Sequence, residues 1–144
     1  MPSASFTHDV TLSRPADEIW ERLQEAETWA NIGPVDEVWD AEHDEDGALQ
    51  RYRWSTTVGL RSYRGTARTQ QFDAPTLMSL ALDGGELAGT LTTRLSENGA
   101  GTAMEVTLEI TSRGALSTLF FPLVSEVVGR GLPEQVERFA ESFD

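Results

Sequence analysis

The C-terminal part of the chain has the sequence of one long helix whose first half is apolar on nearly every side. This half, Leu116–Val128, is shorter than the roughly 20 residues that a membrane-spanning helix needs, and a helix that is apolar all round is normally buried. Between Pro122 and Pro133, which also enclose Gly129 and Gly131, we expect a kink or break in the helix. The rest of the chain must therefore provide a large apolar surface against which this helix packs.

The N-terminal part of the chain predicts one strand followed by two short helices. Apolar side chains alternate with polar ones over Phe6–Leu12, which is the pattern of a half-buried strand. Pro15 and the acidic residues after Ala16 are typical of the first turn of a helix. A second helical segment, Thr28–Ile32, ends at Gly33-Pro34, a pair that stops helices. We therefore expect the order strand, helix, helix in this region.

The middle of the chain, from residue 35 to residue 112, predicts six strands joined by turns. Turn-forming residues recur at 44–47, 59, 73–75, 83–85 and 98–101, and alternating apolar residues fill the intervals between them. Consecutive hairpins build an antiparallel sheet and cannot build a doubly wound parallel one. We therefore predict a single α+β domain over residues 1–144, in which a curved seven-stranded antiparallel sheet wraps around the long C-terminal helix.

The composition limits the partners of such a domain. The formal net charge is −13, which opposes attraction to nucleic acid or to anionic lipid surfaces. The chain has no cysteine, which excludes disulfides, thiolate metal sites and cysteine nucleophiles. It shows neither a signal sequence nor an apolar run that could span a membrane, so we expect a cytoplasmic protein without a cofactor. All 11 basic residues are arginine, which high genomic GC content or adaptation to high salt would both explain.

Two segments resemble the START-like helix-grip superfamily, which includes polyketide cyclase/dehydrase-like and lipid-transport proteins. Residues 13–20 (Ser-Arg-Pro-Ala-Asp-Glu-Ile-Trp) are similar to its strand-to-helix entry, where a proline and an acid precede an isoleucine-tryptophan or valine-tryptophan pair. In residues 57–67 a glycine turn precedes the aromatic-x-glycine motif Tyr63-Arg64-Gly65. These residues resemble the central hairpin of the carbon monoxide dehydrogenase G-like branch. The resemblance covers essentially all of residues 6–143.

The resemblance implies a deep cavity between the concave face of the sheet and the terminal helix, in which relatives hold lipids, sterols, polyketides or isoprenoid quinones. We expect its walls to come from residues that the strand and helix patterns turn inward. These are Tyr52, Trp54, Tyr63, Met78, Leu80, Leu91, Met104, Val106 and Leu108 from the strands, with Leu119, Phe120, Leu123 and Val127 from the helix. A volume of about 300 Å³ or more would suit a small-molecule ligand.

Few polar residues are placed to act on a ligand in this cavity. The candidate catalytic residues are His8, Tyr63 and Arg64, because each could take a proton or steer an enolate. For His8 a partly buried histidine satisfied by a neighbour is the alternative, and for Arg64 a position on the polar face of its strand. His43 lies beside acidic residues, but the spacing of a calcium loop is absent and we predict no metal site.

Three functions fit these features, and we favour the first. It is a protein that binds and shields a hydrophobic small molecule, such as a lipid, an isoprenoid quinone or a polyketide-like compound. The second is a polyketide cyclase/dehydrase-type enzyme acting on a ligand in the same cavity, which requires an inward polar group with a perturbed pKa. The third is a domain that contacts a protein or membrane transiently through the start of the terminal helix. An exposed apolar patch along Leu116–Val124 would support it.

Overall fold

The computed structural model describes residues 3–32, 35–58, 60–99 and 101–143, without the side chains of residues 31, 115–118 and 120. Its elements follow the order β1 (Ser3–Leu12), α1 (Ala16–Leu23), α2 (Ala26–Ile32), β2 (Glu37–His43), β3 (Leu49–Val58), β4 (Arg61–Asp73), β5 (Leu77–Asp83), β6 (Leu87–Glu97), β7 (Thr102–Ser112) and α3 (Ala115–Glu141). This is the predicted order of elements. Gly33, Pro34 and Gly59, where turns are also predicted, lie outside the described residues.

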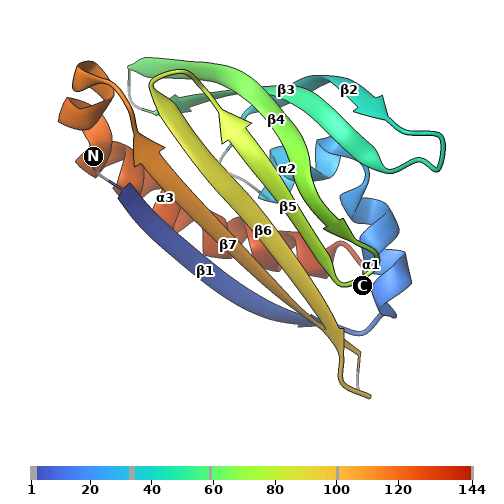
Figure 1. Cartoon of the computed structure of the whole chain (residues 1–144). Helices are drawn as coiled ribbons and strands as arrows, with labels where there is room; N and C mark the ends of the chain where they lie inside the picture. The colour runs from blue at the N-terminus through green and yellow to red at the C-terminus, as the bar shows by residue number, and fades with distance from the viewer. Residues whose placement is uncertain (1–2, 33–34, 59, 100, 144) are drawn as a thin grey trace.

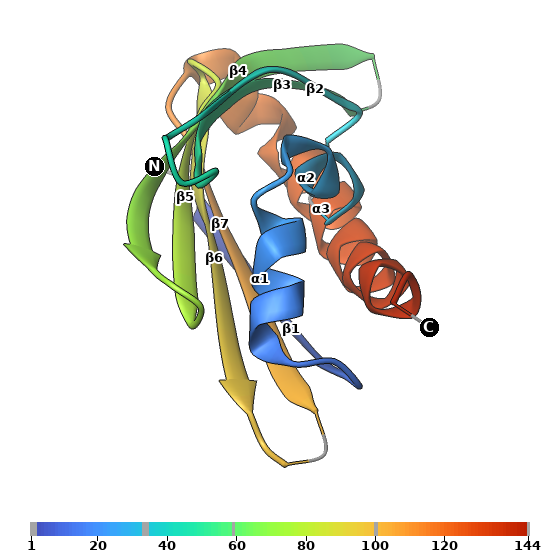
Figure 2. The same cartoon turned by 90° about the vertical axis from the view of Figure 1, so that its right-hand side faces the viewer.

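The seven strands form one antiparallel sheet in the order β1-β7-β6-β5-β4-β3-β2. Strands β1 and β2 are its two edges, so the sheet stays open. Figure 1 shows α3 crossing behind the sheet, and the view turned by 90° in Figure 2 shows all three helices on one side of it. The predicted α+β helix-grip fold, with a curved sheet around a long C-terminal helix, is confirmed.

Strict alternation along the strands decides which side of the sheet the helices cover. In β7, Met104, Val106, Leu108 and Ile110 are buried, whereas Glu105 and Glu109 between them are exposed. Successive side chains of a strand point to opposite faces, so the apolar set points to the helices and the acidic set to solvent. The concave face of the sheet is therefore dry and the convex face is wet.

The two short helices are anchored by specific hydrogen bonds as well as by burial. Glu97 of β6 caps the start of α1, since its Oε1 accepts a hydrogen bond of 2.9 Å from the Ala16 amide. In α2, the indole N–H of Trp29 donates to the carbonyl oxygen of Leu23 over 2.9 Å. These bonds hold α1 against the sheet and α2 against α1.

Helix α3 continues across Pro122 and Pro133, so a predicted break of the helix is wrong, whereas a kink at the prolines stays a prediction. A proline inside a helix costs about 3 kcal/mol through the lost hydrogen bond and steric conflict. A continuous buried stripe offsets this cost by packing on the sheet and on α2. It consists of Phe121, Val124, Val128, Leu132, Val136 and Phe139.

The opposite side of α3 faces solvent along its first half. Leu119, Leu123 and Val127 are exposed by 71%, 44% and 40%. Their spacing of four residues places them in one stripe, which we call the outer stripe. The prediction that this half is buried on every side is therefore wrong, because α3 lies across the sheet and only one of its sides is covered.

The second half of α3 is fixed to β1 and to the start of α1. A Cβ atom on Gly129 would lie only 2.8 Å from Phe6 Cε1, so helix and strand approach as closely as a glycine permits. His8 Nε2 of β1 lies 2.9 Å from Glu137 Oε1 of α3. Beyond the helix, Arg14 donates a hydrogen bond of 2.9 Å to the carbonyl oxygen of Phe143. These contacts set the position of α3 over the concave face.

Candidate ligand-binding site

An apolar cavity lies between the concave face of the sheet, α2 and the first half of α3. The space open to the centres of water-sized molecules is about 60 Å³. Its walls come from Trp29, Val35, Val124 and Val128, together with Tyr52, Trp54, Thr56, Val58, Leu82, Leu87, Ala88, Gly89, Leu91, Leu108 and Ile110 of the strands. The cavity lies where the sequence predicts it, under the C-terminal helix.

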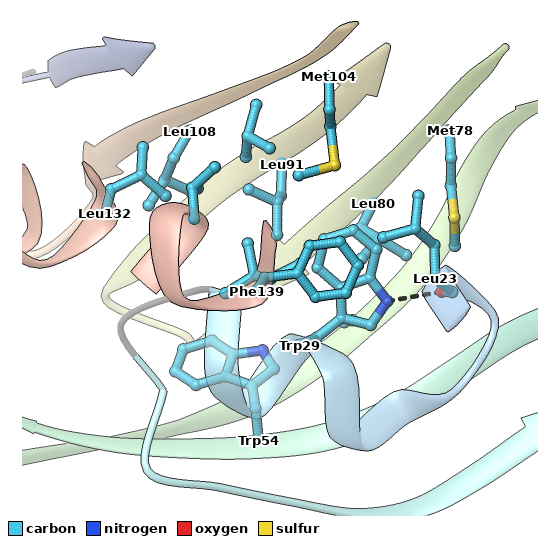
Figure 3. Close-up of a cluster of buried hydrophobic side chains, with 14 of the residues drawn as sticks. Leu23, Trp29, Trp54, Met78, Leu80, Leu91, Met104, Leu108, Leu132 and Phe139 are labelled. Carbon is cyan, nitrogen blue, oxygen red and sulfur yellow. Dashed lines mark hydrogen bonds between the residues drawn. The ribbon is translucent and has the colours of Figure 1, made fainter. Parts of the chain in front are cut away.

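The cavity is much smaller than the roughly 300 Å³ or more that would suit a small-molecule ligand. Large side chains occupy the space under the helix, and Figure 3 shows the rings of Trp29, Trp54 and Phe139 between the strands and α3. The space under the helix is therefore largely filled by side chains in this conformation. A ligand of ordinary size fits only if α3 or these side chains move.

The predicted wall residues divide into three groups. Tyr52, Trp54, Leu91 and Leu108 line the cavity. Tyr63, Met78, Leu80, Met104 and Val106 are buried on the concave side of the sheet but are not among the residues that line it. From α3, Leu119, Leu123 and Val127 belong to the outer stripe, so their predicted place in the cavity wall is corrected to the exposed side of the helix. The side chain of Phe120 lies outside the described residues.

Several wall residues escape the sequence analysis. Val124 and Val128 are missed because the first half of α3 is apolar on both sides, so its sequence does not indicate which side faces the sheet. Leu82 and Ile110 continue the alternation of β5 and β7, a signal that could have found them. Trp29 reaches the cavity from outside the sheet, and no strand or helix periodicity points to it.

The cavity wall carries few polar groups. Burial raises the pKa of the Tyr52 phenol, which therefore stays protonated at neutral pH. Trp54 Nε1 is buried and has no hydrogen-bond partner among the described residues. The hydroxyl of Tyr63, opposite the wall residue Thr56 in the β3–β4 register, is likewise buried and unpartnered within that part of the chain. The site is thus apolar with isolated hydrogen-bonding groups.

None of the candidate catalytic residues is among those that line the cavity. His8 of the edge strand β1 is hydrogen-bonded to Glu137, which agrees with the alternative that a neighbour satisfies this histidine. The guanidinium carbon of Arg64 lies 5.7 Å from the centre of the Trp39 ring, and Arg64 is exposed on the polar phase of β4. Tyr63 points to the concave side but stays outside the lining. The enzyme hypothesis built on these three side chains therefore has no geometric support in this conformation.

The acidic turn around His43 has a local structural explanation. His43 Nε2 lies 2.8 Å from the carbonyl oxygen of Gln24, and Asp44 Oδ1 accepts hydrogen bonds of 2.9 Å from the amides of Asp46 and Ala48. Within the described ranges, no group of three histidine, aspartate or glutamate residues is arranged to hold a metal ion. Among the same residues, no helix combines the length and apolar character needed to cross a membrane.

Comparison with known proteins assigns the chain to a family. The model of the family described as polyketide cyclase/dehydrase and lipid transport matches residues 3–144. The chain therefore belongs to this family, as the sequence resemblance indicates. No curated protein matches the sequence. The resemblance to the carbon monoxide dehydrogenase G-like branch stays a prediction.

Solved structures with the same fold have low sequence identity to this chain. A START superfamily protein from Mycobacterium smegmatis is 16% identical, with 98% of this chain and 95% of that chain covered and a TM-score of 0.69. TTHA0849 from Thermus thermophilus is 14% identical, with 96% and 95% covered and a TM-score of 0.74. Zhui aromatase/cyclase from Streptomyces sp. R1128 is 18% identical, with 95% of each chain covered and a TM-score of 0.62. At these identities the similarity concerns the fold.

Proposed function

We propose that the protein binds and shields a hydrophobic small molecule between the sheet and α3. The observation that supports this proposal is an almost wholly apolar cavity wall, contributed by strands, α2 and α3 together. Membership of a family described by polyketide cyclase/dehydrase and lipid transport agrees with it. Burial of apolar ligand surface contributes about 25 cal/mol per Å², so useful affinity needs no catalytic group.

Ligand entry requires the cavity to widen, and the first half of α3 is the element best placed to move. The hydrogen bonds at Glu137 and Phe143 and the close approach at Gly129 lie in or after the second half of α3, whereas the described residues of its first half are held by apolar packing. The first half carries the outer stripe on its far side, where solvent offers no resistance to displacement. An outward movement of Val124 and Val128 would enlarge the cavity without breaking those contacts.

The test is a thermal unfolding screen with fatty acids and isoprenoid quinones, combined with native mass spectrometry of gently purified protein. A ligand at 100 times its dissociation constant stabilises the folded state by about 2.7 kcal/mol. For a chain of this size we expect the melting temperature to rise by roughly 5–10 °C. The absence of both a thermal shift across a broad panel and a co-purified hydrophobic species would reject the proposal.

A matched pair of variants on α3 locates the site. Val124→Phe fills the cavity from its buried side, whereas Leu123→Phe adds the same ring size to the exposed side of the helix. We expect the first to abolish the ligand-induced shift and the second to preserve it. Because Val124→Phe overpacks the core, Val124→Ala serves as a second variant that enlarges the space and should accept larger ligands. Equal behaviour of all three variants would place the ligand elsewhere.

A further inference from the structure

Trp54, which lines the mostly apolar cavity, carries a buried hydrogen-bond donor that has no partner among the described residues. The residue is 5% exposed and lines the cavity, and its Nε1 has no partner in the part of the chain that the structure describes. An indole N–H can only donate a hydrogen bond. Buried donors in folded proteins are paired with few exceptions, and each exception calls for an explanation.

Trp29, the other tryptophan of the cavity wall, provides a comparison because its indole N–H is hydrogen-bonded within the protein. Trp29 also lines the cavity and is buried, but its Nε1 donates to the carbonyl oxygen of Leu23 over 2.9 Å. Two indoles thus line the same cavity, and among the described residues only the donor of Trp29 has a hydrogen-bond partner. Burial by itself does not account for the difference.

The ring of Trp54 packs closely against the backbone at two glycines. A Cβ atom on Gly65 would lie 2.7 Å from Trp54 Cζ2, and one on Gly84 would lie 2.9 Å from Cη2. The backbone at both positions therefore makes room for the edge of this ring. In Figure 3 the nitrogen of Trp54 lies on the ring edge turned toward the interior, away from its own strand. The close backbone at both glycines restricts rotation of the ring.

We propose that the ligand of this cavity is an apolar molecule with a carbonyl or ether oxygen, which accepts a hydrogen bond from Trp54 Nε1. This inference rests on the proposed function and narrows the ligand class to acceptor-bearing molecules. A site that holds a buried donor discriminates against an analogue without the acceptor, because the donor then stays unpaired. A plain hydrocarbon of the same shape binds this site less well than its apolar surface alone would predict.

The test compares acetophenone with α-methylstyrene, which have the same skeleton and differ by an oxygen in place of a methylene group. Dissociation constants of both probes are measured by titration for the wild type and for Trp54→Phe, which lacks the N–H but keeps an aromatic ring. We expect the preference for the ketone to fall about tenfold in the variant, equivalent to about 1.4 kcal/mol. A preference that changes by less than twofold overturns the inference, and a water molecule as the permanent partner of Trp54 would give this result.

A second measurement uses the wild type, so it does not depend on how the variant folds. In ¹H–¹⁵N spectra, we expect acetophenone to move the indole N–H signal of Trp54 to higher proton frequency, while α-methylstyrene does not. The N–H of Trp29, which is already bonded, serves as the internal control. Binding of both probes without this difference overturns the inference and leaves the proposed function standing. Binding of neither probe overturns the inference together with the binding of small apolar molecules at this site.

Discussion

Two glycines in α3 provide a direct test of how closely this helix lies on the sheet. Gly129 and Gly131 are two residues apart in the same helix, so an alanine at either position gains the same helix propensity, about 0.8–1 kcal/mol. Their surroundings differ. A Cβ atom on Gly131 meets nothing within 4 Å, whereas one on Gly129 would lie 2.8 and 3.2 Å from two ring carbons of Phe6. The pair isolates the contact between α3 and β1.

The expected magnitudes follow from this difference. Gly131→Ala should raise the free energy of unfolding by about 0.8–1 kcal/mol, or the melting temperature by roughly 3 °C. In Gly129→Ala the new methyl group and the Phe6 ring are about 1 Å closer than carbon atoms prefer, so the ring or the strand must shift. Overpacking of this kind costs about 1–3 kcal/mol, which cancels or exceeds the propensity gain. We therefore expect the two variants to differ by about 1–3 kcal/mol.

Urea unfolding followed by circular dichroism measures both free energies. In a Phe6→Ala background the conflict is absent, so the two glycine-to-alanine changes should stabilise equally. This background is the control that assigns the difference to Phe6 and not to some other property of position 129. Equal stabilisation of both variants in the wild-type background would refute the close approach of α3 to β1 on which the position of the cavity depends.

Three further predictions concern Gly65 of β4, the carboxylate of Asp83 and the two sides of α3. Gly65→Ala should destabilise by about 1–3 kcal/mol in urea unfolding, because its methyl group would overlap the carbonyl oxygen of Asp83 and lie 2.7 Å from Trp54 Cζ2; an unchanged midpoint would contradict this. The pKa of Asp83 is lowered by a backbone N–H hydrogen bond and by a neighbouring arginine. Its carboxylate therefore stabilises the fold above the ordinary pKa of about 3.9, and this contribution is lost as the pH falls through the lowered value. The melting temperature of Asp83→Asn should lie below that of the wild type at neutral pH, and this difference should shrink in acid. A difference that does not change with pH would exclude a stabilising role of the Asp83 charge. Leu119→Ser should change stability by less than about 0.5 kcal/mol and Val124→Ala should cost about 1–3 kcal/mol, so equal costs would show that both sides of α3 are buried.

The fold could be predicted from the sequence because each element carries its own local signal. Alternation in β7, the proline and acids at the start of α1, and the turn residues between hairpins act over short distances and agree with one another. The structure also explains why the aromatic-x-glycine motif Tyr63-Arg64-Gly65 has a glycine. Its glycine lies where the ring of Trp54 and the carbonyl of Asp83 leave no room for a side chain. The glycine of this motif, known first from the family resemblance, is therefore required by the packing.

The cavity was harder to predict because its volume depends on how large side chains from separate elements fill one space. Trp54 and Leu91 follow from strand phase, but Trp29 arrives from α2, and its position depends on the hydrogen bond to Leu23. A sequence pattern identifies the direction of a side chain and not the space that remains beside it. The volume of about 60 Å³ is therefore set by tertiary packing, which the sequence patterns do not describe.

The two errors in α3 have a single cause, which also shows how the correct wall could have been found. In the second half of the helix, Leu132, Val136 and Phe139 are buried, and the acidic and arginine residues between them identify the inner side. A continuous helix carries this phase backward at 3.6 residues per turn to Val128 and Val124, which line the cavity. The expected kink or break at the prolines removes that continuity. The apolar first half then has leucine and valine on both sides, and no polar residue distinguishes the inner side from the outer one. The inner face of α3 is set by its amphipathic C-terminal half and transmitted through an unbroken backbone.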